Sequence, residues 1–259
     1  MGRQVLALEA RLRGCSNVRT IGVHPNFSDY SASDVKSIRE ASIIYYPTAF
    51  YADLFDAVGK ATFPSYHTYK CVQDKIKQSA LFQLAGLPHP KTRVFYGNRQ
   101  QSTITNYFKF PCIAKEPRGS AMGRGVFLIK DREALDAYTH DRHVAYIQQY
   151  LFIDRDIRVV VIGNQIAHAY WRIAQHGEFR TNVAQGGRIS LDRVPQKALE
   201  LARRTASVCG WNDVGIDICC HEGQYTILEA NMKYGREGFR AAGIDYFQMM
   251  ERMIDNGQI

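Results

Sequence analysis

The sequence predicts an α/β protein made of several lobes, with antiparallel hairpins in its central and C-terminal parts. Short helical and strand patterns alternate over residues 1–64. Glycine-containing turns then join apolar runs within 110–129, 156–172 and 214–228. Such turns between β-branched or apolar runs are typical of β-hairpins. A chain of 259 residues is long enough for one large domain or for two to three small lobes.

The N-terminal segment is expected to form a short α/β lobe over residues 1–68. A proline ends a strand because it has no N–H to donate. A serine–aspartate pair can cap a helix, and a glycine favours a helix C-terminus. On these rules the segment contains a helix over 4–13, a strand over 19–25, a helix capped by Ser33-Asp34 that runs through Glu40, a strand over 42–46 and a helix over 49–58 that ends at Gly59.

The central segment, residues 69–145, is expected to form a linker helix and a small lobe. The helix runs from Thr68 to Leu84 and ends at Gly86, before a proline-rich break at 87–90. The small lobe contains a strand over 110–115, a glycine-rich run over 116–125, a returning strand over 126–129 and a helix over 132–139.

The C-terminal segment, residues 146–259, is expected to hold the main sheet from Tyr146 to Leu228. It contains a hairpin over 156–172 and, after a helix over 194–209, a second hairpin. A terminal helix over 245–255 carries an apolar face, which indicates core packing or a dimer contact and includes Phe247, Met249, Met250 and Met253. A homo-oligomer, either a dimer or a tetramer, therefore stays open.

Two carboxylates and an amide in the second hairpin indicate a metal site. Asp217 lies in an apolar strand, and Glu229 and Asn231 lie two residues apart near the end of the next one. Residues two apart on a strand share a face, and a hairpin can bring Asp217 beside them. Carboxylate and amide oxygens suit Mg²⁺ better than Zn²⁺. The alternative is that these are ordinary polar residues at strand ends.

The glycine-rich run over 116–125 suits phosphate binding. It follows a strand that ends at Lys115, and it contains three glycines, a serine and two arginines. The backbone N–H groups of such a hairpin can contact phosphates. The run is not a Walker A loop, since the GxxxxGK[ST] pattern is absent and a strand follows it. A long turn without a ligand is the alternative.

Two further segments suit a nucleotide. The strand over 146–151 includes Gln149 and Tyr150 and could present backbone groups to an adenine edge. Arginines at the ends of the following strands include Arg172 and Arg180. They suit a triphosphate or an acyl-phosphate because the guanidinium group binds phosphate in a bidentate way. Any one of them could instead be a solvent-exposed strand residue.

The order of these segments resembles that of the ATP-grasp enzymes and, within them, the RimK-like amino-acid ligases. The resemblance covers residues 69–238 and depends on Asp74-Lys75, Ile113-Ala114-Lys115 with the run through Gly125, Asp156-Ile157-Arg158, Phe179-Arg180-Thr181-Asn182 with Gly186-Gly187, and Asp217 with Glu229-Ala230-Asn231 and Gly235. It implies an ATP-grasp fold, in which a nucleotide is held between two lobes with antiparallel sheets, here preceded by a short α/β lobe.

The resemblance also implies a role for each matching residue. The cofactors would be ATP and Mg²⁺, with Mn²⁺ as a substitute, and Lys115 and Arg172 would be the catalytic residues. The ATP phosphates would be bound by Lys75 and Lys115, under a lid that contains Gly119, Ser120 and Gly123, and the transferred phosphoryl group by Arg172. Adenine would be bound by Gln149 and Tyr150, ribose by Asp156, and the nucleotide and its phosphates by Arg180, Thr181 and Asn182. Mg²⁺ would be bound by Asp217, Glu229 and Asn231.

The chain departs from the resembled family in three places. The stretch between Gln149 and Asp156 is short, and Gln149 lacks the usual negative charge. Residues 232–236 read Met-Lys-Tyr-Gly-Arg, where RimK has a small, proline-containing turn. These departures leave the acceptor open. Arg236, which follows the metal-binding strand, is expected at the mouth of the site, near an anionic substrate.

Composition argues against a membrane protein or a nucleic-acid-binding protein. No apolar run approaches the ~20 residues of a membrane span, and no apolar signal core is present. The six cysteines, of which Cys219 and Cys220 are adjacent, have no CxxC spacing and indicate reduced thiols, so a cytoplasmic location is expected. The net charge of +8 is spread along the chain without a run of five basic residues, which argues against nucleic acid as the main partner.

These inferences predict an ATP-dependent carboxylate–amine ligase. ATP would phosphorylate a substrate carboxylate, and an amine would attack the acyl-phosphate to give an amide. An amino acid such as glutamate would be added to a small molecule or a peptide. The alternatives are an ATP-grasp kinase, which leaves phosphate on its acceptor, and a non-catalytic nucleotide- or RNA-binding protein, against which the intact acidic set argues.

Overall fold

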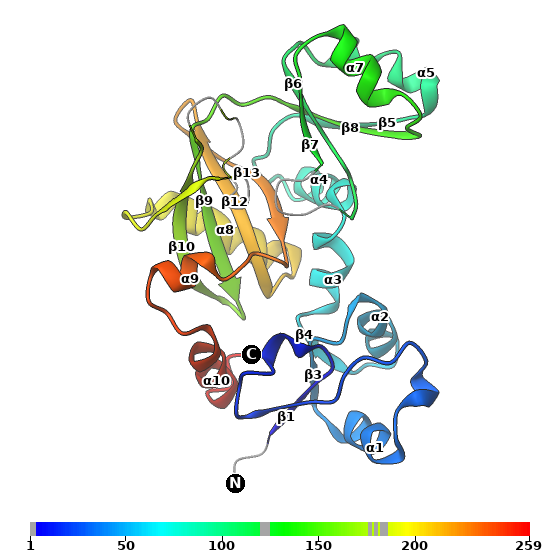
Figure 1. Ribbon diagram of the computed structural model, residues 1–259, viewed down its shortest axis with the longest axis vertical. Helices are drawn as coiled ribbons and strands as arrows, with labels where there is room; N and C mark the ends of the chain where they lie inside the picture. The colour runs from blue at the N-terminus through cyan, green and yellow to red at the C-terminus, as the bar shows by residue number, and fades with distance from the viewer. Residues whose placement is uncertain (1–3, 120–124, 176–177, 179–180, 182–185) are drawn as a thin grey trace.

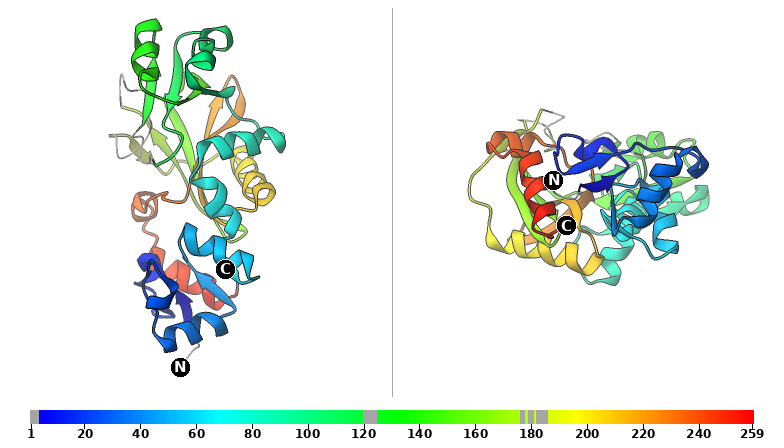
Figure 2. Two further views of the ribbon diagram at one scale, coloured as in Figure 1. Left: turned by 90° about the vertical axis from the view of Figure 1, so that its right-hand side faces the viewer. Right: turned by 90° about the horizontal axis from the view of Figure 1, so that it is seen from below.

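The described residues form three sheets that are stacked along the long axis of the molecule (Figures 1 and 2). The computed structural model describes residues 4–119, 125–175, 178, 181 and 186–259. A parallel sheet lies at one end, the larger antiparallel sheet in the middle and the smaller antiparallel sheet at the other end. This arrangement confirms the prediction of an α/β lobe followed by lobes with antiparallel sheets.

The N-terminal lobe is a parallel sheet in the order β2-β1-β3-β4. Its elements are β1 (Val5–Ala7), a 3₁₀ helix (Ala10–Leu12), β2 (Val18–Thr20), a second 3₁₀ helix (Phe27–Asp29), α1 (Ala32–Glu40), β3 (Ile43–Tyr45), α2 (Ala49–Ala57) and β4 (Ala61–Phe63). The expected helix over 4–13 is wrong, because β1 pairs with both β2 and β3 in the interior of the sheet. Burial of this apolar run between two strands overrides its local helical pattern.

Two helices, not one, link the N-terminal lobe to the rest of the chain. The expected helix over 68–84 is divided into α3 (Tyr66–Val72) and α4 (Lys75–Leu84). The Asp74 carboxylate accepts hydrogen bonds from the backbone N–H groups of Ile76 and Lys77, at 2.9 and 3.2 Å. It therefore caps a new helix. In α1, the capping residue is Ser31 and not Ser33.

The smaller antiparallel sheet has the strand order β5-β8-β6-β7. Its lobe contains β5 (Thr92–Tyr96), α5 (Gly97–Gln101), α6 (Ile104–Tyr107), β6 (Cys112–Lys115), β7 (Val126–Ile129), α7 (Arg132–Thr139) and β8 (Val144–Gln149). We expected the strand that includes Tyr146 in the main sheet, and this is wrong, because β8 pairs with β5 and β6. The division of the chain at residue 145 stays a prediction, although the smaller sheet itself extends to Gln149.

The larger antiparallel sheet has the strand order β11-β10-β9-β12-β13. Its elements are β9 (Arg155–Ile162), β10 (Gln165–Ile173), β11 (Arg188–Ser190), α8 (Gln196–Cys209), β12 (Asp213–His221) and β13 (Gln224–Asn231), and α9 (Glu237–Ala241) and α10 (Tyr246–Asp255) follow. Both expected hairpins and the helices expected over 194–209 and 245–255 are confirmed. Met250 and Met253 of α10 are buried, so the apolar face of this helix packs in the core.

Strand β9 shows what covers each face of the larger sheet. Its residues 157, 159 and 161 share a core with small residues of α8. Its residues 160 and 162 share a second core with α10 and the N-terminal lobe. Alternate residues of a strand face opposite sides. Asp156 and Arg158 therefore lie on the face that α8 leaves uncovered.

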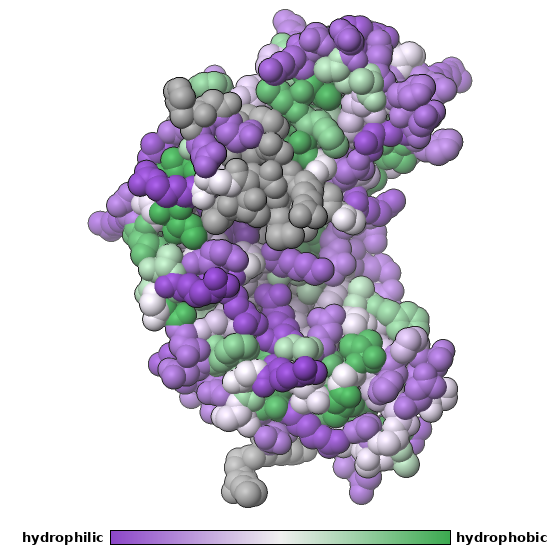
Figure 3. Space-filling model, viewed as in Figure 1, coloured by the Kyte–Doolittle hydropathy of each residue, from purple (hydrophilic) through white to green (hydrophobic). Residues whose placement is uncertain are grey.

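No helix in the described part of the chain is long and apolar enough to cross a membrane. Hydrophilic side chains dominate the face shown in Figure 3, and the apolar side chains there form scattered patches. Cys219 is buried and its neighbour Cys220 is exposed, as expected for adjacent strand residues that point to opposite faces.

We predict that Met250→Ala lowers the free energy of unfolding by about 2–5 kcal/mol, because it removes a buried side chain and leaves a cavity. Met250 is 0% exposed where α10 meets the N-terminal lobe and the larger sheet. Urea denaturation measures the change. Gln248→Ala is the control, since Gln248 is exposed on the same helix. Equal losses in the two variants would contradict the placement of α10 in the core.

Candidate active site

A pocket lies where the smaller antiparallel sheet meets the larger one. Residues from strands of both sheets line it. Its polar lining, apart from Gln148, consists of predicted site residues, namely Lys115, Gln149, Tyr150, Asp156, Arg172, Thr181, Asp217 and Glu229. Its apolar lining consists of Ile113, Val126, Leu151, Ile153 and Leu228. The fold therefore brings together residues that are far apart in the sequence.

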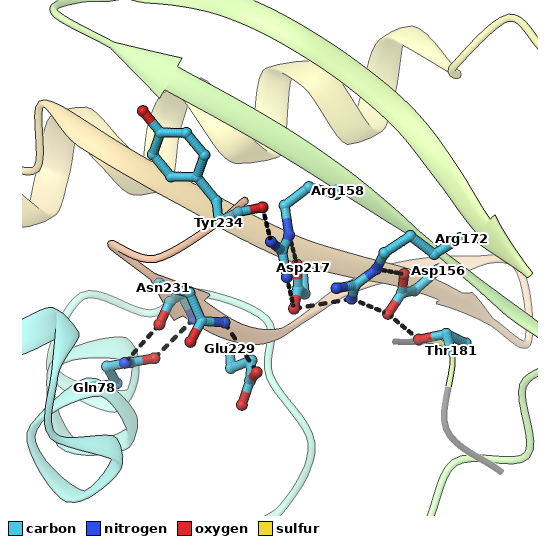
Figure 4. A network of polar contacts seen from close by, with 10 residues as sticks. Gln78, Asp156, Arg158, Arg172, Thr181, Asp217, Glu229, Asn231 and Tyr234 are labelled. Atoms are coloured by element: carbon cyan, nitrogen blue, oxygen red, sulfur yellow. Dashed lines mark hydrogen bonds and ion pairs between the residues drawn. The ribbon is translucent and has the colours of Figure 1, made fainter. Parts of the chain in front are cut away.

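Four charged side chains of the larger sheet form a buried row of ion pairs (Figure 4). Arg172 donates from Nε and Nη2 to the two oxygens of Asp156, at 2.7 and 2.6 Å, and its Nη2 lies 2.9 Å from Oδ2 of Asp217. Arg158 donates to both oxygens of Asp217, with an Nη2–Oδ2 distance of 2.9 Å. None of these four residues, which we call the ion-pair row, is more than 6% exposed.

The register of the larger sheet explains the ion-pair row. Asp156 is paired across the strands with Arg172, Arg158 with Asp217, and Asp217 with Glu229. Residues directly opposite each other in a sheet have their side chains on the same face. The row therefore crosses β10, β9 and β12 and reaches β13. A slip of one residue in any pairing would turn these side chains to the other face.

Glu229 and Asn231 lie at the β13 end of this row. Nδ2 of Asn231 donates a hydrogen bond to Oε1 of Glu229 at 2.9 Å. Between them, the side chain of Gln78 in α4 donates to the backbone oxygen of Ala230 at 2.9 Å and accepts from its N–H at 2.8 Å. Gln78 is 3% exposed, so it fixes the strand between the two site residues (Figure 4). Its role was not predicted, because a glutamine in a helix carries no signal for such a contact.

Two lysines set the charge of Glu229. Nζ of Lys115 lies 4.0 Å from Oε2 of Glu229, and Lys75 lines a smaller cavity with both residues. Burial alone would raise the pKa of Glu229, but the Lys115 and Lys75 ammonium groups outweigh burial and lower this pKa to about 2. Burial lowers the pKa of Lys115, and Glu229 opposes this effect. Glu229 is therefore ionised at neutral pH.

The oxygen groups at this end of the pocket fit a hard cation that is held together with phosphates. No group of three or more His, Cys, Asp or Glu side chains in the described part of the chain is placed to hold a metal by itself. The two arginines use three of the roughly four lone-pair sites of the Asp217 carboxylate, which leaves one, and Asp217 is paired across the strands with Glu229. Mg²⁺ is commonly bound by one or two carboxylates and substrate phosphates, so this set fits Mg²⁺ or Mn²⁺.

The start of the glycine-rich run is tied to α4. Nε of Arg118 donates to Oδ2 of Asp74 at 2.7 Å, and the N–H of Lys75 donates to the backbone oxygen of Pro117 at 3.0 Å. Gly119 has a φ of +70°, which favours glycine. Residues 117 and 118 are thereby held near α4. Outside the described residues lie four predicted site residues, Ser120, Gly123, Arg180 and Asn182.

Asp156 is already bound within the protein. Besides its two bonds from Arg172, it accepts a hydrogen bond from the hydroxyl of Thr181 at 2.6 Å. The predicted contact of Asp156 with ribose therefore stays a prediction. Thr181 lines the pocket, and its hydroxyl is directed toward this carboxylate (Figure 4).

Arg236 is not among the residues that line this pocket. Its guanidinium group stacks on the rings of Tyr246 and Phe247, at 4.4 and 4.5 Å from their centroids. Its Nη2 donates to the backbone oxygen of Arg11 at 3.0 Å. The aromatic face of α10 and the N-terminal lobe therefore hold this side chain. Its predicted contact with an anionic substrate stays a prediction.

The model of the RimK-like ATP-grasp domain matches residues 72–254. The chain belongs to the RimK-like ATP-grasp family. The matched residues include α4, both antiparallel sheets and nearly all of α10. They therefore contain the whole ion-pair row and both residues at its β13 end.

The relatives of this RimK-like chain are ligases. It is 26% identical over 223 residues to the ribosomal protein bS6–L-glutamate ligase of Escherichia fergusonii, which covers 83% of this chain and 74% of the relative. It is 29% identical over 239 residues to the glutamate–LysW ligase ArgX of Sulfolobus acidocaldarius, with 87% and 83% covered. The predicted class, an ATP-dependent ligase that forms C–N bonds, is confirmed at the level of the family.

Solved structures confirm the ATP-grasp fold. The RimK domain protein of Sphaerobacter thermophilus superimposes with a TM-score of 0.71 at 17% identity, over 96% of this chain and 98% of that one. The ATP-grasp ligase PsnB, solved with Mg and ADP, superimposes with a TM-score of 0.69 at 17% identity, over 99% of both chains. At these identities the likeness shows the fold alone.

We predict that Glu229→Gln removes a pH-dependent part of the stability. Folding lowers the pKa of Glu229 from 4.5 to about 2, so its ionised form stabilises the folded state above pH 4.5, and this contribution is lost as the pH falls toward 2. The full contribution is on the order of 3 kcal/mol, of which about 2 kcal/mol is lost between pH 6 and pH 3. Urea denaturation at these two pH values, without ligands, measures the difference between parent and variant.

Glu222→Gln is the control for this experiment, because the Glu222 side chain is 87% exposed in the turn after β12. Its stability should follow that of the parent at both pH values. A difference between parent and Glu229→Gln that is the same at pH 6 and pH 3 would contradict the lowered pKa.

Proposed function

We propose that the chain is an ATP-dependent ligase that joins an amino acid such as glutamate to a carboxylate of a peptide or protein carrier. The names of two relatives describe addition of glutamate to ribosomal protein bS6 and to LysW. The observation that carries the proposal is the position of Lys115 and Arg172 beside Asp217 and Glu229 in one pocket. This arrangement places cations for a phosphoryl group next to oxygens that suit Mg²⁺.

In the proposed reaction, ATP phosphorylates the substrate carboxylate, the amine attacks the acyl-phosphate, and phosphate leaves as the amide forms. Lys75 and Lys115 would bind phosphates, and Arg172 would stabilise charge on the transferred phosphoryl group. Asp156 and Asp217 hold Nε and Nη2 of Arg172 and so fix its guanidinium plane before a substrate binds. Such preorganised charges stabilise a transition state without reorganisation at the moment of reaction.

The remaining site residues keep their predicted roles as proposals. Mg²⁺, bound by Glu229 and Asn231 with Asp217, would neutralise part of the phosphate charge. Gln149 and Tyr150 lie by the apolar lining and would bind adenine. Proposed contacts with the nucleotide further include those of Asp156, Gly119, Ser120, Gly123, Arg180, Thr181 and Asn182.

The proposal is tested by incubating the protein with ATP, Mg²⁺, glutamate and a set of carrier peptides with free carboxylates. ADP release should require both glutamate and the carrier, and mass spectrometry should show the carrier extended by glutamyl residues. Release of ADP with a stable phosphorylated acceptor and no amide would instead establish a kinase. ATP binding without turnover for any amino acid and carrier would contradict a ligase.

We predict that Arg172→Lys lowers kcat by about 10²-fold, because lysine keeps the charge but cannot form the forked contact with phosphate and both carboxylates. The KM for ATP should change by less than about threefold, since the lysines still bind the phosphates. Steady-state kinetics measures both. Arg155→Lys, at the start of β9 with a 51% exposed side chain, is the control and should resemble the parent. Equal effects of the two substitutions on kcat would contradict a role of Arg172 in the reaction.

A further inference from the structure

A second buried polar cluster lies at the start of β12, beside the ion-pair row. Asp213 is 0% exposed, and its two oxygens accept hydrogen bonds from the hydroxyl groups of Tyr234 and Tyr46, at 2.6 and 2.9 Å. Nη2 of Arg11 lies 3.9 Å from the same carboxylate. The Arg11 guanidinium group also lies over the two tyrosine rings, 4.8 and 5.3 Å from their centroids. We call these four residues the Asp213 cluster.

The Asp213 cluster joins the N-terminal lobe to the larger sheet. Arg11 and Tyr46 belong to the N-terminal lobe, Asp213 begins β12, and Tyr234 follows β13. Burial raises the pKa of Asp213, and Arg11 and the two tyrosine hydroxyls oppose this effect. A buried carboxylate that loses such donors is left with an uncompensated charge. The cluster therefore favours one arrangement of the lobe against the sheet.

Tyr234 connects this cluster with the ion-pair row, and Figure 4 shows its contact with Arg158. Its hydroxyl binds Asp213, and its backbone oxygen accepts a hydrogen bond from Nη1 of Arg158 at 3.0 Å. Arg158 holds Asp217 with its other two nitrogens, Nε and Nη2. The position of one tyrosine therefore affects both a contact between lobes and the orientation of the arginine that holds Asp217.

Gly215 shows how closely these groups are packed. It lies on β12 between Asp213 and Asp217, and a Cβ atom there would collide with Cβ of Tyr234 and lie 2.9 Å from Cδ of Arg158. Only glycine allows this approach. Tyr234 and Arg158 therefore pack directly on the strand that carries Asp217, and a shift of Tyr234 cannot be absorbed by empty space.

We propose that Tyr234 is a positioning residue, which couples the Asp213 cluster through Arg158 to Asp217. The inference rests on the proposed function only in that Asp217 belongs to the metal–nucleotide end of the site. The hydrogen bond between Tyr234 and Asp213 then affects how well the site holds a metal–nucleotide complex, whichever carboxylate and amine are joined.

The test compares Tyr234→Phe with Tyr46→Phe. Each substitution removes one hydroxyl donor from the Asp213 carboxylate and keeps the ring under Arg11, so both should lower the melting temperature by similar amounts. Only Tyr234→Phe should weaken binding of Mn²⁺·ATP, by about threefold to tenfold, the range expected for one lost hydrogen bond. Electron paramagnetic resonance of Mn²⁺ and calorimetry measure this binding without turnover. Metal-free ATP should bind both variants within about twofold of the parent, since the lysines are unchanged.

A double-mutant cycle tests whether the effect passes through Arg158. Arg158→Lys alone should weaken Mn²⁺·ATP binding, and adding Tyr234→Phe should weaken it little further, because both changes act on one chain of contacts. Additive losses would overturn the coupling. Equal loss of Mn²⁺·ATP affinity in Tyr234→Phe and Tyr46→Phe, or no loss in either, would also overturn it.

A further variant covers the case in which Tyr234→Phe does not fold. Asp213→Asn keeps an acceptor for the hydroxyls but removes the charge that strengthens their bonds. It should weaken Mn²⁺·ATP binding in the same direction, and an unchanged affinity would overturn the proposal. A parent protein that binds Mn²⁺·ATP but joins no amino acid to a carrier would refute the proposed ligase and leave this inference standing. A parent that binds no Mn²⁺·ATP would overturn both.

Discussion

The ion-pair row is the interaction on which the rest of the site depends. It places two carboxylates and two guanidinium groups in the interior of the larger sheet, where a charge is tolerated only when it is paired and hydrogen-bonded. The valines and isoleucines of β9 alone would accept a slip of two residues, because they would still face the same side. The charges would not, since such a slip separates Asp156 from Arg172 and Arg158 from Asp217. The row therefore specifies the register that apolar packing leaves open.

One face of the larger sheet has two parts, one at the pocket and one at the contact with the N-terminal lobe, and β9 contributes to both. Along this face Asp156 lines the pocket and Arg158 binds Asp217, which also lines it, whereas Val160 and Ile162 pack with α10 and the N-terminal lobe. The change from polar to apolar residues within one strand marks the boundary between the pocket and the contact between lobes. Tyr234 lies at this boundary. Its backbone oxygen accepts a hydrogen bond from Arg158 on one side, and its hydroxyl donates one to Asp213 at the contact between lobes. Tyr234 therefore contacts both the candidate site and the residues that pack the N-terminal lobe against the sheet.

The parts of the fold that could be predicted from sequence are those that local patterns determine. The hairpin around Gly163 and the helix that ends at Gly210 have a clear period and a clear end signal, and both are confirmed. The strand β1 was predicted as a helix, because only its two neighbouring strands explain its burial. Family motifs indicated most of the residues that line the pocket. Gln78, Arg158 and Tyr234 received no role, since their contacts depend on how strands and helices meet after folding.

The local charge of the pocket, and not the net charge of the chain, explains what it can bind. The four charges of the ion-pair row sum to zero. Lys75, Lys115 and Glu229 then leave one net positive charge at the β13 end, which favours a polyanion. Glu229 stays ionised there because its pKa is lowered to about 2, so an anionic oxygen persists among the cations. The lysines suit phosphate, and the carboxylate beside them suits a metal ion. The pocket therefore suits a metal–phosphate complex better than either component alone. The net charge of +8 of the whole chain is not needed for this preference.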